Sequence, residues 1–181
     1  RSDAVLGYRG FKLKIGRGHR WLGRAEGDRR DIEVTRTVRD AFPTAMHIAA
    51  ARAIEHDLLP SLERLEATLA AKAEAFAGIV KIGRTHLQDA TPLTFGQEFS
   101  GYVEQLAQSA AAIELTLSGL RELAIGGTAV GTGLNTHPQF AERMVKDLSQ
   151  ATGLGFASAA NKFAALAGHE ALVFAHGALR V

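Results

Sequence analysis

Two short stretches of the sequence gather polar side chains of the kinds that bind or transform small anions. The first, residues 83–90, contains Thr85, His86 and Gln88. These residues supply a hydroxyl, an imidazole that titrates near neutrality and an amide. His86 could therefore move a proton as a general acid–base group. The alternative for the same residues is a polar loop whose side chains cap neighbouring helices.

The second stretch, residues 126–136, is dense in glycine and threonine and ends in Asn135 and Thr136. Glycine allows backbone N–H groups to approach an anion closely. We expect Asn135 and Thr136 at a helix N-cap, where the helix dipole favours negative charge, so a dicarboxylate would suit this stretch. A tight turn between two helices explains the same composition. The Gly-Lys-Ser/Thr ending of a phosphate-binding P-loop is missing.

The elements that must hold these stretches are predicted to be helices, because apolar residues recur at steps of three and four. No strand pattern of weight is expected; residues 10–15 alternate only weakly. Glycines and prolines separate the helices. The predicted helices cover residues 44–58, 60–80, 94–125, 137–152 (ended by Gly153) and 161–181.

The predicted helix over residues 94–125 has one apolar stripe and would be roughly 48 Å long. A helix of this length in so small a chain cannot bury its stripe alone. The fold class is therefore predicted to be all-α, a long-helix bundle completed by other chains.

The composition is that of an ordinary globular protein, with 46% hydrophobic and 22% charged residues in 181. The absence of cysteine excludes disulfides, zinc–thiolate sites and thiol catalysis. His169 and His176 lie seven apart on one predicted helix without a third ligand, so no metal site is expected. There is neither an apolar run of 18 residues nor a signal pattern, so we expect a cytoplasmic protein without a membrane partner.

The first part of the chain differs in character from the rest. Residues 1–40 carry 11 Lys/Arg and 6 Asp/Glu, whereas residues 41–181 carry 10 and 13. Such an arm could bind nucleic acid, but its basic residues do not share a helical face and are not interleaved with stacking aromatics, so no nucleic-acid partner is expected. We interpret residues 1–39 as a basic, Gly/Arg-rich segment that comes from a shifted reading frame or a mis-joined start.

Four segments in order and at regular spacing resemble class II fumarate hydratase (fumarase), of the fumarase/aspartase superfamily. They are FPTAMHIAAA at 42–51, KIGRTHLQDATPLTFGQEFSGYV at 81–103, GGTAVGTGLNT at 126–136 and NKFAALAGHEALV at 161–173. The resemblance covers about residues 41–181. The nearest alternative is an aspartase-like ammonia-lyase, which typically has Gln where this chain has His86.

The resemblance implies the reversible hydration of fumarate to L-malate in the tricarboxylic acid cycle, without a metal or organic cofactor. A proton leaves the carbon next to a carboxylate, and the site must stabilise the resulting negative charge. By resemblance, His86 transfers protons through a water and Thr85 holds a substrate carboxylate, while Asn135 and Lys81 bind substrate nearby. The family assembles as a homotetramer around a central helix bundle, with each active site drawing on three subunits.

The sequence also departs from the family pattern. Before FPTAM the family has Ser-Ser-Asn-Asp, and here only Asp40 agrees. The family's mobile loop, which supplies a proposed catalytic base, is absent, and residues 40–181 read as a partial central domain cut in mid-helix. We therefore expect little or no hydratase activity from the isolated chain. A non-catalytic helical assembly module is the second hypothesis, and a basic-arm nucleic-acid binder is the third.

Overall fold

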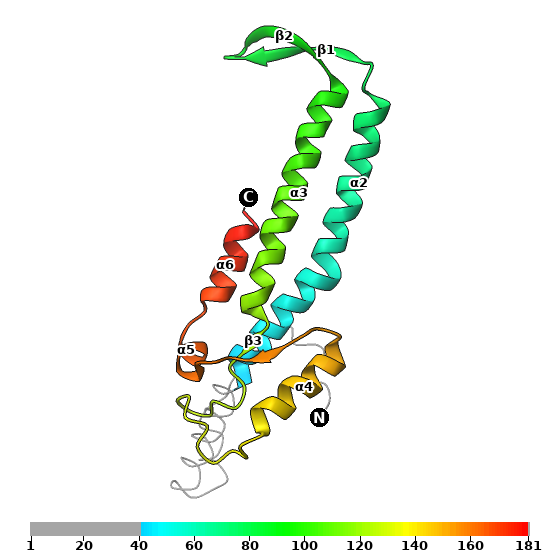
Figure 1. Cartoon of the computed structure of the whole chain (residues 1–181). Helices are drawn as coiled ribbons and strands as arrows, with labels where there is room; N and C mark the ends of the chain where they lie inside the picture. Colours follow the sequence, from blue (N-terminus) through cyan, green and yellow to red (C-terminus); the bar gives the residue numbers. More distant parts are fainter. Residues whose placement is uncertain (1–40, 181) are drawn as a thin grey trace, which may run out of the picture. The chain divides into compact units, whose positions relative to one another are not determined.

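The computed structural model describes residues 41–180 (Figure 1). The segment 1–39, with its expected weak strand and its interpretation as a foreign start, lies outside the described residues. The described chain divides into two compact units. The first unit contains residues 41–50 and 120–170, and the second contains residues 51–119 and 171–180.

Helical structure runs without a break from residue 41 to residue 75. Residues 41–52 are helical, the π-helix η2 covers Ala53–Leu58, and α2 covers Leu59–Ala75. The predicted break before Pro60 is therefore wrong. The N–H of Leu59 donates to the carbonyl of Ile54, which is a π-type bond, and Pro60 stands in the first turn of α2. Pro60 lacks an N–H and therefore cannot continue the ordinary i→i−4 hydrogen-bond ladder at this point of the helix.

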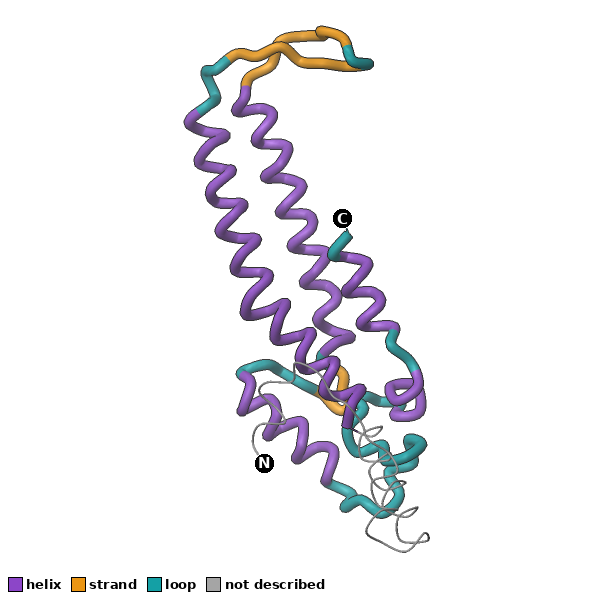
Figure 2. The backbone as a smooth tube through the Cα atoms, turned by 180° about the vertical axis from the view of Figure 1, so that it is seen from behind, coloured by secondary structure: helices purple, strands orange, loops and turns teal. Residues whose placement is uncertain are grey.

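The second unit is built on two long helices, α2 and α3 (Phe95–Leu120), which run side by side (Figures 1 and 2). Helix α6 (Glu170–Ala178) lies along α3, where a Cβ added to Gly119 would lie 3.2 Å from the Cβ of Ala171. Helix α3 has 26 residues, about 39 Å, because the chain leaves the helix after Leu120 and not at Ile125 as predicted. The mainly helical architecture confirms the predicted fold class.

The predicted apolar stripe of α3 is confirmed, with burial that increases along the helix. Phe95 at its start is 37% exposed, whereas Ile113, Leu117 and Leu120 are buried. The buried side chains of this unit also include Ile54 and Leu59 from the start of the α2 run and Ala175 and Ala178 from α6. The core therefore lies toward the C-terminal end of α3, away from the turn between α2 and α3.

A two-stranded antiparallel hairpin closes the other end of the helix pair (Figure 1). It consists of β1 (Val80–Thr85) and β2 (Gln88–Thr94), with Val80 paired to Thr94 and Thr85 to Gln88. The expectation that the sequence holds no strand of weight is wrong here, and α2 ends at Ala75 and not at Val80. Neither strand contains a buried residue. A ribbon exposed on both faces lacks the apolar alternation that reveals a half-buried strand.

The first unit is held by a short parallel pairing of β3 (Glu122–Leu123) with β4 (Ala157–Ser158). Helix α4 (Phe140–Thr152) lies between these strands in the chain, and α5 (Lys162–Ala167) follows them. Its core includes Leu123, Ala124, Leu154, Phe156 and Ala159.

Two of this unit's helices differ from the prediction. Helix α4 ends at Gly153 as predicted, since this glycine adopts φ 76°. Its start at Phe140, not His137, follows from Pro138, because a residue before proline disfavours the helical conformation. The predicted helix over 161–181 is divided into α5 and α6 at Gly168, whose backbone is extended.

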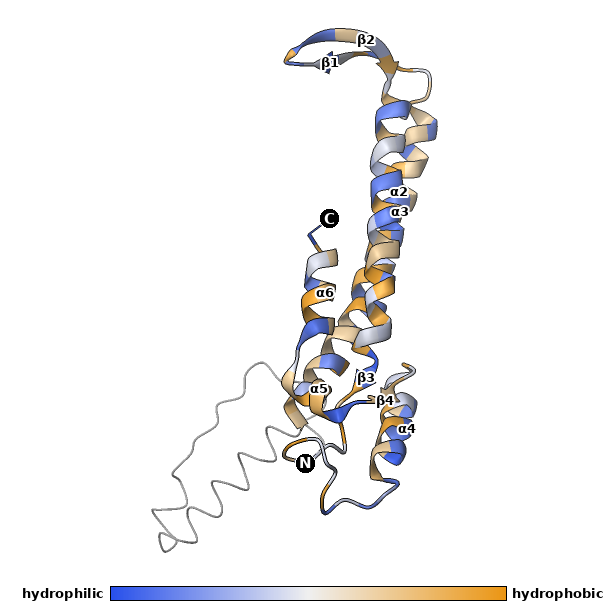
Figure 3. Ribbon diagram, turned by 60° about the vertical axis from the view of Figure 1, so that its left-hand side comes forward, coloured by the Kyte–Doolittle hydropathy of each residue, from blue (hydrophilic) through white to orange (hydrophobic). Residues whose placement is uncertain are grey.

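Large apolar side chains remain exposed on both units. They include Tyr102 and Leu115 on α3, Val173 and Phe174 on α6, and Phe163 on α5. Figure 3 shows along the ribbon which parts of the helices are made of hydrophobic residues. Among the described residues, no helix is both long and apolar enough to cross a membrane.

The close approach of α2 and α3 at Gly96 gives a first prediction. A Cβ at this position would lie 2.6 Å from the carbonyl oxygen of Ala73 and 2.7 Å from the Cα of Ala77. Because both atoms belong to the backbone, Gly96→Ala should lower the free energy of unfolding by about 1–3 kcal/mol. Gly101→Ala is the matched control, since no atom lies within 4 Å of its added Cβ. The control should leave stability unchanged or raise it by up to about 1 kcal/mol. Urea unfolding followed by circular dichroism measures both, and equal effects would contradict the packing argument.

Candidate functional site

The tip of the β1–β2 hairpin carries the two residues to which the sequence assigns the chemistry. Thr85 is the last residue of β1, and His86 with Leu87 forms the two-residue connection to β2. His86 and Leu87 both have positive φ, 50° and 62°. Such turns match the twist of a hairpin but favour Asn-Gly, because L-residues with a Cβ are strained there. The tip therefore holds two side chains at positions that the backbone does not favour.

The side chains at this tip face solvent. Thr85, His86 and Leu87 are all exposed, and Leu87 is 102% exposed relative to its reference state. Among residues 41–180, the His86 ring has no hydrogen-bond partner. An imidazole in this position is accessible to water and to a bound molecule, as a general acid–base group must be. Strained backbone that carries exposed polar groups is a frequent property of functional sites.

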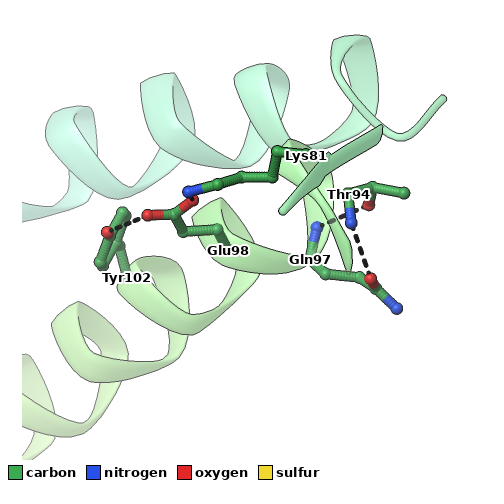
Figure 4. A network of polar contacts seen from close by, with 5 residues as sticks. All are labelled: Lys81, Thr94, Gln97, Glu98 and Tyr102. Atoms are coloured by element: carbon green, nitrogen blue, oxygen red, sulfur yellow. Dashed lines mark hydrogen bonds and ion pairs between the residues drawn. The ribbon is translucent and has the colours of Figure 1, made fainter. Parts of the chain in front are cut away.

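The base of the hairpin is anchored to α3 by a polar network (Figure 4). The Nζ of Lys81 on β1 forms an ion pair with Glu98 Oε2 on the first turn of α3. Tyr102 OH donates a 2.9 Å hydrogen bond to Glu98 Oε1. The hydrogen bond from Lys81, followed by that from Tyr102, lowers the pKa of the Glu98 carboxyl below its usual value. The neighbouring carboxylate in turn raises the pKa of Tyr102.

The other strand joins α3 through a capping box. Gln97 N–H donates to Thr94 Oγ1 at 3.1 Å, and Thr94 N–H donates to Gln97 Oε1 at 2.9 Å (Figure 4). This reciprocal pair satisfies two N–H groups at the helix start, and the sequence spacing Thr-x-x-Gln is its signature. The rings of Phe76 and Phe99 also pack edge to face, with their centroids 5.7 Å apart.

The glycine-rich stretch 126–136 forms a loop that satisfies its own backbone. The N–H groups of Gly131 and Gly133 both donate to the carbonyl of Gly127, at 2.9 and 3.0 Å. Thr136 directs its N–H and its hydroxyl to the carbonyl of Gly133. These groups are therefore engaged within the loop and do not form an open anion cradle.

Asn135 does not stand at a helix N-cap, which corrects the expectation from the sequence. Helix α4 begins at Phe140 after Gln139, because Pro138 displaces the helix start. Asn135 instead adopts a left-handed conformation (φ 66°), which asparagine tolerates better than most residues, and its side chain is exposed. A side chain in this position can still donate and accept hydrogen bonds.

Lys162 connects three parts of the first unit. Its Nζ donates to the carbonyl of Ala159 at 3.1 Å, to the carbonyl of Leu123 at 3.4 Å and to the hydroxyl of Ser158. Burial lowers the pKa of its ammonium group. Lys162 was not among the residues predicted from the sequence. Its partner Leu123 lies 39 residues earlier, and no periodic pattern connects the two.

The structure brings Lys81, Thr85 and His86 together on one hairpin, whereas Asn135 lies in the other unit. Lys81 stands at the base of β1 and the other two at its end. Sequence reasoning also missed Glu98, the partner of Lys81. Within the described part of the chain, no three His, Cys, Asp or Glu side chains gather in a way that could hold a metal ion.

This arrangement is a mainly helical scaffold that presents polar residues on a hairpin and in a loop. The sequence model of the lyase family matches residues 13–181, and the chain belongs to this family. The match begins within the segment 1–39. The interpretation of that segment as a shifted reading frame or a mis-joined start stays a prediction.

The relatives named class II fumarate hydratase confirm the resemblance found in the sequence. Those of Bordetella parapertussis and Nitrosomonas europaea are 59% and 57% identical to the chain over 163 residues. In both cases the alignment covers 90% of this chain and 35% of the relative. The chain therefore spans about a third of the length of these curated relatives.

Solved structures agree with this assignment. The class II fumarase of Schistosoma mansoni superposes with a TM-score of 0.75 and 44% identity, covering 77% of this chain and 32% of that structure. A fumarate lyase:delta crystallin protein of Brucella melitensis gives a TM-score of 0.72 and 35% identity, covering 92% and 37%.

The strained tip predicts a stabilising substitution. Leu87→Gly removes a fully exposed side chain and its Cβ, so it relieves the positive φ without a loss of packing. We expect the hairpin to become more stable by roughly 0.5–1 kcal/mol. Native-state hydrogen exchange of the cross-strand amides measures this gain. Leu87→Ala keeps the Cβ and should bring no gain; equal slowing of exchange in both variants would show that the side chain, not the backbone, is responsible.

The Tyr102–Glu98 contact predicts an abnormal titration. The chain has two tyrosines, so Tyr8→Phe leaves Tyr102 as the only phenol. Its pKa is raised because its hydroxyl donates to the Glu98 carboxylate and a phenolate there would be repelled. Phenolate absorbance should therefore develop at a pH above the usual value of about 10. Glu98→Gln should move the midpoint back down toward that value, and an unchanged midpoint would contradict the contact.

Proposed function

We propose that this chain forms part of a fumarate hydratase, which adds water to fumarate to give L-malate. The similarity to class II fumarate hydratases over 90% of the chain carries this proposal. The exposed imidazole of His86 beside Thr85 on the hairpin tip supports it, because the chemistry needs a proton-transfer group next to a hydroxyl donor.

Each proposed site residue has a role that its surroundings allow. His86 transfers protons through a water, and Thr85 donates its hydroxyl to a substrate carboxylate. Asn135 donates its amide N–H to the substrate from the loop 126–136. Substrate binding by Lys81 stays a prediction. In this structure its ammonium group forms an ion pair with Glu98. Together such donors would stabilise the negative charge that forms when the proton leaves carbon.

The proposal extends to the assembly of the protein. We infer a homotetramer in which α3 and α6 pack against other subunits, and each active site draws on more than one of them. Exposed apolar side chains such as Leu115, Val173 and Phe174 support this, because large apolar groups in contact with water favour association. A place in the tricarboxylic acid cycle, a cytoplasmic location and the lack of a cofactor belong to the same proposal.

The second candidate is a helical assembly module without chemistry. The same exposed apolar residues on α3 and α6 favour it, since packing with other subunits needs neither His86 nor Thr85. Dicarboxylate binding distinguishes the two functions, because only the enzyme requires it.

A chimaera tests the proposed function. Residues 41–181 would replace the matching segment of the Bordetella parapertussis enzyme, and fumarate formation from L-malate would be followed by its ultraviolet absorbance. We expect an active chimaera, in which His86→Ala lowers kcat by about 10²- to 10⁴-fold. The isolated chain should show little or no activity, because it spans only about a third of its relatives.

His56→Ala is the matched control, because His56 is an exposed histidine of η2 outside the proposed site. It should leave kcat unchanged. A chimaera that assembles but neither binds dicarboxylate nor forms fumarate would overturn the proposal in favour of the assembly module. An active His86→Ala variant would contradict only the role proposed for His86 and not the proposed function as a whole.

A further inference from the structure

Within residues 41–180, the hairpin that carries His86 is joined to the helices only at its base. Its strands contain no buried residue, and the ion pair between Arg84 and Asp89 links β1 to β2 without reaching a helix. His86 lies five residues from Lys81, about 17 Å along an extended strand. A tilt of about 10° at the base would therefore move the tip by roughly 3 Å. The position of His86 depends on how firmly the base is held.

Strand β2 is fixed to α3 by continuity. Thr94 is the last residue of β2 and at the same time the N-terminal residue of the capping box with Gln97. The N–H of Phe95, the next residue, donates to the carbonyl of Ile79 at 2.9 Å. This strand consequently continues the helix directly, and its direction at the base is set by α3.

Strand β1 has no such continuity, because the turn 76–79 separates it from α2. Lys81 provides its side-chain link to α3: among the described residues, no other β1 side chain bonds to a helix. The Lys81 ammonium contacts Glu98 and also lies 5.0 Å from the centroid of the Phe95 ring. Both partners belong to the first turn of α3.

Glu98 is itself held from its other side. Its Oε1 accepts the hydrogen bond from Tyr102, one turn further along α3, while its Oε2 receives Lys81 (Figure 4). The carboxylate therefore has both oxygens engaged and a defined orientation. The side chains of Lys81 and Glu98 are 28% and 29% exposed, so the pair is partly shielded from water. Partly buried ion pairs are screened less by salt than fully exposed ones.

We propose that Glu98 is a positioning residue for His86, because it fixes β1 to α3 through Lys81 and so sets the direction of the hairpin tip. The significance of this inference for catalysis rests on the function proposed for His86. In this role Lys81 acts through the hairpin and does not need to touch the substrate. Tyr102 supports this role, because its hydrogen bond holds the Glu98 carboxylate toward β1.

The test uses the 181-residue chain without substrate, so it can fail independently of the hydratase proposal. Residual dipolar couplings report the mean orientation of the β1 and β2 N–H groups relative to those of α3, and hydrogen exchange reports hairpin opening. Glu98→Gln and Lys81→Met should each change the hairpin couplings and speed cross-strand exchange by roughly two- to fivefold. The double variant should resemble either single variant, since both remove one interaction. Lys81→Arg keeps the charge and should preserve the wild-type orientation.

Lys72→Met is the control for the loss of a lysine beside an aromatic ring. Lys72 on α2 has its ammonium 5.5 Å from the centroid of the Phe76 ring and makes no ion pair with a described carboxylate. This variant should leave the hairpin couplings unchanged, and the α3 amides should keep their protection in all variants. Wild-type hairpin orientation in Glu98→Gln would overturn the proposal. Additive effects in the double variant would overturn it as well, because they would show that the two residues act separately.

Discussion

The close approach of α2 and α3 at Gly96 determines how the far end of this helix pair is built. With no side chain at this position, the backbone of α3 comes against Ala73 and Ala77, and its N–H bonds to the carbonyl of Phe76. The two helices are consequently in contact where the chain between them must leave and return. Fifteen residues, 80–94, have no room between the helices and extend beyond them as a ribbon. The exposed position of His86 follows from this packing.

The sequence predicted those parts of the fold whose signals are local or periodic. The stripe from Phe95 to Leu120 identified α3, and Gly153 correctly ended α4. The hairpin was missed because neither of its faces is buried, so β1 and β2 show no sustained alternation of apolar and polar residues. The polar residues of the tip were proposed from their chemistry together with the family resemblance, and nothing in their spacing indicated a turn with two positive φ angles.

Pairings across long stretches of sequence could not be predicted in this way. Glu98 lies 17 residues from Lys81, and their meeting depends on the hairpin register and on the start of α3. Lys162 and Leu123 meet only through the parallel pairing of β3 with β4. The helix start after Pro138 is the opposite case, because it follows a local rule. Pro138 disfavours a helical conformation at His137, and this restriction overrides the N-cap preference of Asn135.

Placing the proposed proton-transfer group, His86, on an exposed hairpin has a physical consequence for the precision of its position. A buried site holds its side chains by packing on all sides, whereas His86 has solvent around it and a strained turn beneath it. Its precision must therefore come from the rigid helix pair and from the few contacts at the hairpin base. Because the apolar core lies toward the C-terminal end of α3, polar contacts and the Phe76–Phe99 pair provide this rigidity. An exposed group anchored in this manner is suited to complete a site whose other walls come from elsewhere, since it reaches outward while its own scaffold stays fixed.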